Sequence, residues 1–291
     1  MSRRRAFVLA GVVGTSTLVA CTTRASDTAS STSSSVSAGS TTATGDAAAT
    51  CAEAAPQETA GPYPSDGSNG PNVLIESGIV RSDIRSSFGT SSGTAEGVPA
   101  SITMTLKDLA NECAAGAGMA VYLWHCNRAG EYSLYSEAIA DQNYLRGVQV
   151  ADANGLLSFT SIFPACYPGR WPHIHFEVFD SLESAVAGDN ARLTSQLALP
   201  QEACETVFAS DRGYADSVTN LAQVSLDSDN VFGDGWDAEL ATVTGDATGM
   251  SITMVIGVAE KSANNQAPSG PQPPGSDGQP SGQRPPGPPP N

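Results

Sequence analysis

Two of the three histidines in this chain lie two positions apart, in the stretch CYPGRWPHIHF at residues 166–176. Side chains at positions i and i+2 of a β-strand point to the same face, so His173 and His175 are expected to stand side by side on an extended chain. The apolar residues that alternate with them, up to Val178, would form the opposite face. Paired imidazoles on one face of a strand are typical of a metal site.

A carboxylate on the same strand face is one candidate for a third metal ligand. His173, His175 and Glu177 would all point one way, which matches the two-histidine, one-carboxylate arrangement of non-haem Fe(II) enzymes. Same-face neighbours are roughly 6.5–7 Å apart along a strand, so one metal ion comfortably takes only two of the three. The spacing therefore favours Glu177 as a residue at the rim of the site.

Two tyrosines in nearby turns are the other candidate ligands. Tyr167 lies in a turn rich in Pro and Gly shortly before His173, and Tyr132 follows the turn at 128–131. Phenolates are hard, anionic ligands, and two of them with two imidazoles favour Fe(III) over zinc or copper. A tyrosine in a turn is more often a packing residue, so the spacing alone leaves both open, with Tyr135 as the alternative to Tyr132.

The surrounding sequence predicts the strands that must position these residues. Residues 101–106 and 251–256 alternate between polar and apolar side chains, which is typical of half-buried strands. Residues 119–124 form a more continuous apolar run, typical of a strand covered on both faces. Further strands are predicted at 156–159, 172–179 and 237–243, and a helix only at 201–209. Many short strands and little helix predict an all-β fold, a β-sandwich.

The two ends of the chain differ in composition from the segment between them. Residues 1–20 combine three arginines with an apolar stretch and predict an export signal, with Sec and twin-arginine export both open. Cys21 follows the apolar run directly, in a sequence that resembles a bacterial lipobox, so lipidation of Cys21 and a membrane anchor are predicted. The remaining parts are a Ser-, Thr- and Ala-rich tether at 21–50, one domain at 51–261 and a Pro- and Gly-rich disordered tail at 262–291.

The charge of the chain excludes one class of partner. The formal net charge is −16, from 30 acidic and 14 basic residues. Removal of Arg3, Arg4 and Arg5 with the signal would make it −19, since −16 − 3 = −19. A nucleic-acid partner requires a basic face, which this composition cannot supply.

Five cysteines follow Cys21. In an exported protein they are expected to be oxidised, which predicts two disulfides and one free thiol, with the pairing open. Thiolate zinc is the weaker alternative, because no two of them have the C-x2-4-C spacing of such sites. The five are Cys51, Cys113, Cys126, Cys166 and Cys204.

The runs VYLWHCNRAGEYSLYS and NYLRGVQVADANGLLSFTSIFPACYPGRWPHIHFEV resemble the intradiol ring-cleavage dioxygenases, the group that contains catechol 1,2- and protocatechuate 3,4-dioxygenases. The likeness covers most of residues 56–180 and includes PQETAGPYP, similar to a Gly-Pro-aromatic segment of the family. It implies a β-sandwich of the intradiol type. It also implies an Fe(III)-dependent enzyme that cleaves catechol-type aromatics with O2 to cis,cis-muconate-type products.

The resemblance assigns the metal ligands position by position. Tyr132 matches the first tyrosinate of the family, in its G-x-Y motif, and Tyr167 matches the second. His173 and His175 match the histidines of its H-I-H motif. By the family mechanism, the tyrosinate at the position of Tyr167 leaves the iron and takes a proton when a catechol binds.

The resemblance also assigns three pocket residues. Arg170 matches an active-site arginine that would stabilise negative charge developing on the ring. Gln196 matches, more weakly, a glutamine that assists the substrate ring, and Tyr63 matches a pocket aromatic. Tyr167 and Arg170 are closer than in many intradiol enzymes, which implies a shorter pocket wall and leaves the substrate preference open. His125 is expected to be a hydrogen-bonded structural residue.

The family's cytoplasmic catechol dioxygenases have a helical dimerisation region before the catalytic domain, and here a tether stands in its place. The chain therefore looks most similar to the secreted, single-domain branch, an enzyme at the outer face of the membrane or released. The oligomeric state stays open. Two rival interpretations also remain: a lipid-anchored β-sandwich binding protein with a vestigial metal site, and a metalloenzyme that uses His173, His175 and a carboxylate.

Overall fold

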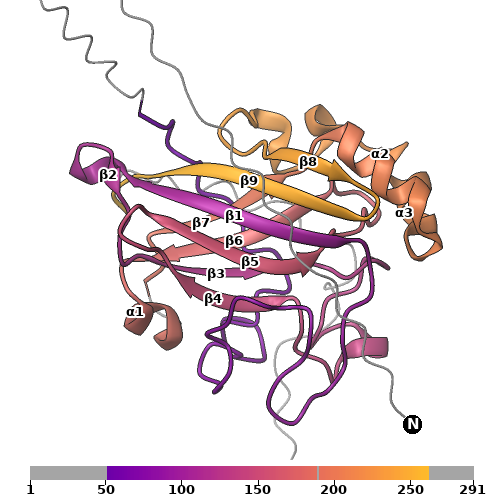
Figure 1. The fold of residues 1–291 in the computed structure, drawn as a ribbon, viewed down its shortest axis with the longest axis horizontal. Coiled ribbons are helices and arrows are strands. Elements are labelled where there is room, and N and C mark those ends of the chain that lie inside the picture. Colours follow the sequence, from indigo (N-terminus) through magenta and orange to yellow (C-terminus); the bar gives the residue numbers. More distant parts are fainter. Residues whose placement is uncertain (1–50, 189, 262–291) are drawn as a thin grey trace, which may run out of the picture. The chain divides into compact units, whose positions relative to one another are not determined.

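The computed structural model describes residues 51–188 and 190–261, and within them two β-sheets pack face to face around one main apolar core (Figure 1). The all-β sandwich predicted from the sequence is confirmed. The predicted export signal, Cys21, the tether at 21–50 and the Pro-rich tail lie outside the described residues.

The nine strands of the described residues divide between the two sheets, and the second sheet carries the paired histidines. The first sheet consists of β1 (Pro99–Asp108), β2 (Ala114–Ala115), β5 (Leu156–Ile162), β8 (Thr242–Asp246) and β9 (Gly249–Val258). The second consists of β3 (Ala120–Trp124), β4 (Arg146–Val150), β6 (His173–Phe179) and β7 (Leu193–Ala198). Its strand order is β4-β3-β6-β7, so β6 is held by neighbours on both sides.

The helices of the described residues are short and lie outside the sheets. They are α1 (Leu182–Ala187), α2 (Gln201–Ser210) and α3 (Ala215–Leu221), with 3-10 turns η1 (Leu109–Asn111), η2 (Glu137–Ile139), η3 (Arg212–Tyr214), η4 (Leu226–Ser228) and η5 (Phe232–Asp234). Figure 1 shows α2 and α3 together at one end of the sandwich and α1 towards the other. Across 51–188 and 190–261, no helix has the length and apolar character needed to cross a membrane.

Two identical SITM stretches pair in parallel in the first sheet. Residues 101–104 of β1 lie opposite residues 251–254 of β9, each residue beside its own copy. Ile102 and Ile252 are fully buried in the core, whereas the serines and threonines between them are at least partly exposed. The alternation of polar and apolar residues in the sequence thus corresponds to a sheet with one face buried in the core and one face exposed to solvent.

The strand β6 is buried along its whole length, because both of its faces are covered. Ile174, Phe176 and Val178 belong to the core between the sheets. The opposite face is covered by residues 51–65, here called the N-terminal arm. The arm pairs with the sheet edges through Ala55 N–H to the Gly257 carbonyl and Glu58 N–H to the Thr194 carbonyl, at 2.9 and 2.7 Å.

One predicted strand is wrong over most of its length. Residues 237–241 were expected to extend as part of a strand, but β8 begins only at Thr242. The preceding residues turn back on themselves instead, since the backbone N–H groups of Glu239 and Leu240 both bond to the Trp236 carbonyl, at 2.9 and 2.8 Å.

The prediction of two disulfides is also wrong within the described residues. One bond is present, between Cys51 and Cys113, with Cα atoms 5.8 Å apart. Cys126, Cys166 and Cys204 are free and buried. Each thiol contacts a backbone carbonyl in the core, so these cysteines pack as small apolar residues. The number of cysteines in the chain therefore did not predict the number of disulfides.

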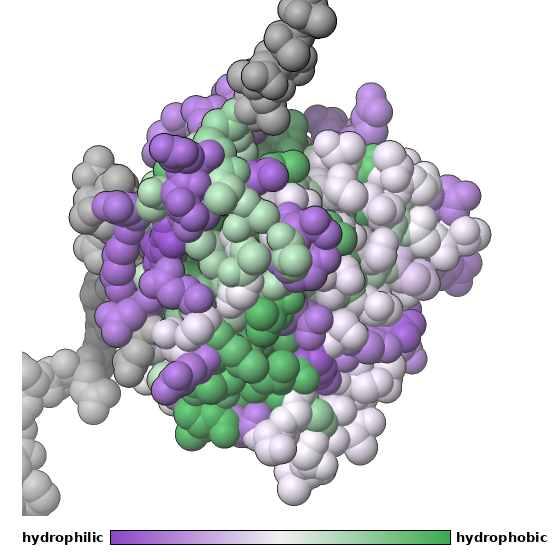
Figure 2. Space-filling view, turned by 60° about the vertical axis from the view of Figure 1, so that its left-hand side comes forward, coloured by the Kyte–Doolittle hydropathy of each residue, from purple (hydrophilic) through white to green (hydrophobic). Residues whose placement is uncertain are grey.

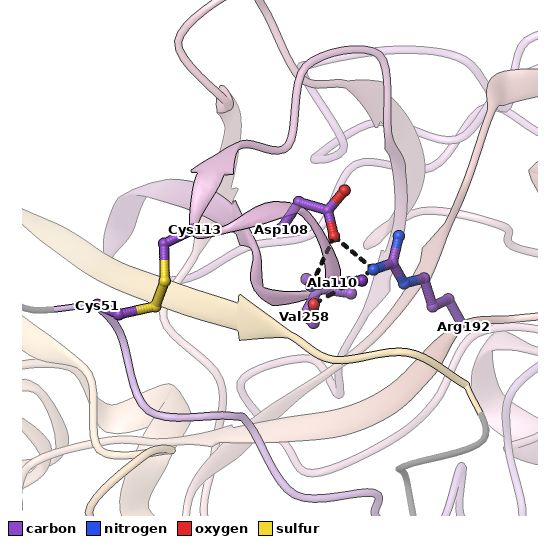
Figure 3. Close-up of a disulfide and its surroundings, with 6 residues drawn as sticks. All are labelled: Cys51, Asp108, Ala110, Cys113, Arg192 and Val258. Atoms are coloured by element: carbon purple, nitrogen blue, oxygen red, sulfur yellow. Dashed lines mark hydrogen bonds and ion pairs between the residues drawn. A yellow bond between two sulfur atoms is a disulfide. The ribbon is translucent and has the colours of Figure 1, made fainter.

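The disulfide fastens the first residue of the N-terminal arm to the loop after β1 (Figure 3). Beside it, Arg192 pairs with the carboxylate of Asp108 and contacts the Val258 carbonyl, which joins the ends of β1 and β9 to the start of β7. The disulfide therefore ties the base of the arm to the first sheet, and Arg192 joins that sheet to the second.

The surface of the domain also carries apolar side chains. Figure 2 shows hydrophobic residues gathered on one part of a face, bordered by hydrophilic ones. Large exposed apolar residues of the domain come from several elements, among them Ile75, Val150 and Val255. Such exposure is ordinary for a folded domain.

Replacing Cys51 and Cys113 together with Ser is expected to lower the free energy of unfolding by about 4 kcal/mol, because the bond closes a loop with a sequence separation of 62 residues. Thermal unfolding with and without reductant measures this. Reductant should destabilise the wild type and leave the double variant unchanged. Equal stability of the two proteins would contradict the prediction.

Candidate functional site

The strand β6 places His173 and His175 on one face, as the sequence predicted. Their Nε2 atoms are 3.1 Å apart and their ring centroids 4.7 Å apart. His175 lies opposite Trp124 of β3 and Gln196 of β7, and its ring stacks on the Trp124 ring at 5.0 Å and 3°. A strand held on both sides gives the two imidazoles a rigid support.

Both imidazoles are buried, and burial favours their neutral forms. His173 Nδ1 lies 2.5 Å from the Trp171 carbonyl oxygen and donates to it, which leaves Nε2 as the unprotonated nitrogen. Burial, reinforced by the charge of Arg170, holds the pKa of His173 well below its usual range. Burial and the neighbouring His173 do the same for the pKa of His175.

The two predicted tyrosine ligands converge on these histidines. Tyr167 Oη is 3.1 Å from His173 Nε2. The Tyr132 ring is 5.9 Å from the Tyr167 ring and 6.2 Å from the His175 ring. Tyr132 Oη is buried and has no hydrogen-bond partner among the described residues. Burial raises the pKa of Tyr132 well above its usual value and that of Tyr167 to about 12.

The four side chains fit a hard metal ion. Two imidazoles and two phenols meet at one point, and the buried Tyr132 hydroxyl lacks the partner that burial normally demands. In the described part of the chain, no group of three or more His, Cys, Asp or Glu side chains could hold a metal ion. A metal centre here therefore depends on the tyrosines, and two phenolates with two imidazoles suit Fe(III).

The alternative ligands are engaged elsewhere. The Glu177 carboxylate accepts from Thr194 Oγ1 at 3.1 Å. Tyr135 Oη accepts from the Ser65 N–H at 2.8 Å and donates to an Asn69 side chain. His125 bonds through both ring nitrogens, to the Cys126 carbonyl and to Ser161 Oγ, at 2.8 and 2.7 Å, which confirms its structural role.

A buried arginine, Arg146, joins the segments that carry the site. Its guanidinium donates to the Pro64 carbonyl of the N-terminal arm at 3.0 Å and to Tyr122 Oη of β3 at 3.1 Å. It also donates to the hydroxyl and the carbonyl of Ser133, next to Tyr132, at 3.1 and 3.0 Å. The role of Arg146 could not be predicted from the sequence, because nothing local shows what a buried arginine will bind.

The N-terminal arm closes the site from above the imidazoles. Gly61 has a φ of +70°, and a Cβ there would lie 3.2 Å from His175 Cε1, so a side chain at this position would press on a predicted ligand. Tyr63 follows and packs against Tyr132 and Tyr135, with ring centroids at 4.9 and 5.1 Å. Because Tyr63 is 36% exposed, it lies at the rim of the site.

Arg170 and Gln196 lie together beside the metal face, as the resemblance implied. Arg170 Nη2 donates to Gln196 Oε1 at 2.7 Å, and Gln196 Nε2 donates to the Thr59 carbonyl of the arm at 2.9 Å. The Arg170 side chain is 14% exposed and forms an ion pair with the buried Asp229. The sequence analysis missed Asp229, which lies far along the chain without a local motif.

Buried carboxyl groups lie on the Arg170 side of the site, and burial raises the pKa of two of them. Burial and then the charge of Asp234 raise the pKa of Glu58 to about 7. Burial and then the charge of Glu58 raise the pKa of Glu239 to about 9. Glu239 Oε1 accepts weakly from Ser195 Oγ at 3.4 Å, and its Oε2 is buried with no partner in the described residues. Glu239 is thus a neutral acid at physiological pH.

Comparison with known proteins agrees with this geometry. The model of a family described as "Dioxygenase" matches residues 85–185, which include all four candidate ligands. A solved intradiol ring-cleavage dioxygenase from Tetranychus urticae is similar in structure, with a TM-score of 0.56, 22% identity, and coverage of 71% of this chain and 94% of that one. The resemblance to the intradiol ring-cleavage dioxygenases is confirmed.

A second solved structure, of the dioxygenase Tetur07g02040, is similar to this chain with a TM-score of 0.55 and 22% identity, and the match covers 72% of this chain and 95% of that one. Among curated protein sequences, none matches the chain. The structural likeness shows that the fold is that of the intradiol enzymes, and the family match over residues 85–185 supports a ring-cleaving dioxygenase.

Replacing Glu239 with Gln is expected to stabilise the protein increasingly as the pH rises. The carboxyl keeps its proton in the folded state up to about 9 but ionises from 4.5 in the unfolded chain, so the wild type loses stability between these values. The amide does not titrate. The advantage of the variant should therefore grow by about 4 kcal/mol between about pH 5 and about pH 8.

Urea unfolding at a series of pH values measures this difference. Glu76→Gln, at an exposed position, is the control and should follow the wild type. Parallel pH profiles for Glu239→Gln and the wild type would show that Glu239 ionises normally in the folded state.

Proposed function

We propose that this dioxygenase is an exported, Fe(III)-dependent enzyme that cleaves catechol-type aromatics with O2 to cis,cis-muconate-type products. The observation that carries the proposal is the convergence of Tyr132, Tyr167, His173 and His175 around one point, with the Tyr132 hydroxyl lacking a partner among the described residues. These four residues would hold the iron. When bound, Fe(III) draws electron density from a catechol, which makes the ring reactive towards O2.

The two tyrosines would differ in role because they differ in exposure. Tyr132 is 1% exposed, so its phenol has no path to solvent or substrate and suits a permanent ligand. Tyr167 is only partly buried and lies beside Arg170, on the open side of the site. Burial raises the pKa of Tyr167 to about 12, so its phenolate would be a strong enough base to accept one of the protons that a catechol gives up on binding.

The pocket residues would act on charge and orientation. The Arg170 guanidinium would stabilise negative charge developing on the ring, and preorganised donors of this kind contribute about 2.7–4 kcal/mol each. Gln196 fixes the guanidinium from one side and is itself fixed by Thr59 of the arm. Tyr63, at the rim, would pack against the substrate ring.

The rival interpretations have less support in the site. A two-histidine, one-carboxylate centre would need Glu177, whose carboxylate bonds to Thr194 instead. A vestigial binding protein would have no use for a fixed Arg170 beside an intact set of four donors. The acidic composition, with a net charge of −16, disfavours a nucleic-acid partner.

The location of the enzyme is part of the proposal. The arginines and apolar run of residues 1–20 and the lipobox-like Cys21 support export and a lipid anchor on the outer face of the membrane, with release as the alternative. The catalytic domain would then be residues 51–261, displayed on the tether at 21–50.

A visible spectrum of the iron-loaded protein, taken before and after addition of catechol, tests the proposed function. The wild type should be coloured by tyrosinate-to-iron charge transfer and should convert catechol to a muconate. Tyr167→Phe should shift the band and lower kcat by at least about 10²-fold, because it removes both a ligand and a proton acceptor.

Tyr135→Phe is the matched control, since this neighbouring phenol bonds to the arm and should leave the band in place. An unchanged spectrum in Tyr167→Phe would remove Tyr167 from the ligand set. A colourless iron-loaded wild type without catechol turnover would overturn the proposed function.

Replacing Cys21 with Ser tests the anchor. Lipidation requires the thiol, so the variant should leave the membrane fraction while its catechol turnover per iron stays unchanged. Cell fractionation and mass spectrometry of the mature N-terminus measure the two effects. Recovery of the wild type as a fully soluble protein with no acyl group would contradict the lipobox.

A further inference from the structure

A buried carboxylate holds Arg170 from the side opposite to Gln196. Asp229 Oδ2 accepts from Arg170 Nε at 3.0 Å and from the Trp171 backbone N–H at 2.6 Å. The Asp229 side chain is 0% exposed, so this ion pair is shielded from water and from salt. One carboxylate oxygen thus binds both the side chain of Arg170 and the backbone of the next residue.

Asp229 is itself held in place through its other oxygen. Oδ1 accepts from the backbone N–H groups of Val231 and Phe232, at 2.8 and 3.3 Å. Its own N–H bonds to the Ser225 carbonyl at 3.0 Å. The carboxylate therefore has four donors and a fixed turn beneath it, and it cannot follow Arg170 if the arginine moves.

Together these contacts determine the plane of the guanidinium. Nε is bonded to Asp229 and Nη2 to Gln196, while the guanidinium carbon lies 6.0 Å from the Phe232 ring centroid. Among the described residues, no acceptor bonds to Arg170 Nη1. The two anchored nitrogens leave the third as the donor available to a bound anion.

A buried ion pair is weak evidence of a stabilising role. Removing two charges from water costs about as much as their attraction returns, so such pairs are often no more stable than apolar residues of the same volume. Orientation is a different matter, because a misplacement of about 1 Å at a reacting centre can cost about 10²-fold in rate.

We propose that Asp229 is a positioning residue of this dioxygenase, which fixes the guanidinium plane of Arg170 so that Nη1 stays directed to the substrate. The inference rests on the proposed function, because it assigns Asp229 a role through the catalytic role of Arg170. Without the Asp229 carboxylate, the guanidinium would keep only its bond to Gln196 and would be free to rotate about it.

A double-mutant cycle with Asp229→Asn and Arg170→Gln tests the proposal. Asp229→Asn should retain iron and colour, bind catechol under nitrogen with the wild-type spectral change, and lower kcat by about 10–100-fold with KM changed by less than about threefold. In the Arg170→Gln background, the same substitution should change kcat by less than about twofold, since there is no longer a guanidinium to position.

Asp227→Asn is the matched control, because it makes the same chemical change two residues away on an exposed side chain, and it should behave as the wild type. Equal losses from Asp229→Asn in both backgrounds would assign Asp229 to the fold and overturn the proposal. If Asp229→Asn does not fold, Asp229→Glu replaces it in the cycle, with the same expected dependence on Arg170. Failure of both to fold would also overturn it. A wild type that does not cleave catechol refutes the proposed function instead.

Discussion

The buried guanidinium of Arg146 connects the parts of this molecule that the site requires. It lies on β4 and bonds to the N-terminal arm at Pro64, to the loop of Tyr132 at Ser133, and to β3 at Tyr122. A guanidinium that is 1% exposed must satisfy its donors inside the protein, so these segments have to meet around it. The position of the Tyr132 loop follows from that requirement.

The site combines a rigid base with a cover that comes from a distant part of the chain. The imidazoles lie on β6, which is paired on both sides and stacked on Trp124. The cover is the arm, which reaches the site at Gly61 and binds Gln196 through Thr59, 137 positions away in sequence. The precise placement of the two histidines therefore comes from a sheet, and the cover over them comes from a long-range contact.

The sequence predicted the parts of the site that depend on local periodicity. The alternation around His173 and His175 was enough to place both imidazoles on one strand face. The two tyrosines were not predictable from spacing, because a turn does not reveal where its side chain points, and only the family resemblance selected Tyr132 over Tyr135. Asp229 lies 59 residues from Arg170, in a turn with no motif, so only the folded chain brings it into view.

The same distinction applies to the fold. Strands with an alternating or continuous apolar pattern lie where the pattern predicts them, whereas the strand expected at 237–243 gave way to a turn. That turn is stabilised by two backbone hydrogen bonds to the Trp236 carbonyl. The pattern of apolar residues does not predict such bonds. The number of disulfides was mispredicted for a related reason. The sequence does not distinguish a cysteine that packs in the core as a free thiol from one that forms a disulfide.

The pairing of the arm with β9 brings the two ends of the described domain together. Ala54 forms a bridge with Gly257, so the chain enters and leaves along the same edge of the first sheet. A domain whose ends are neighbours can be inserted into a loop of another protein, or reconnected end to end and reopened elsewhere, with little change to its core. This architecture thus makes the domain a transferable unit, whose position within a longer polypeptide places few demands on its internal packing.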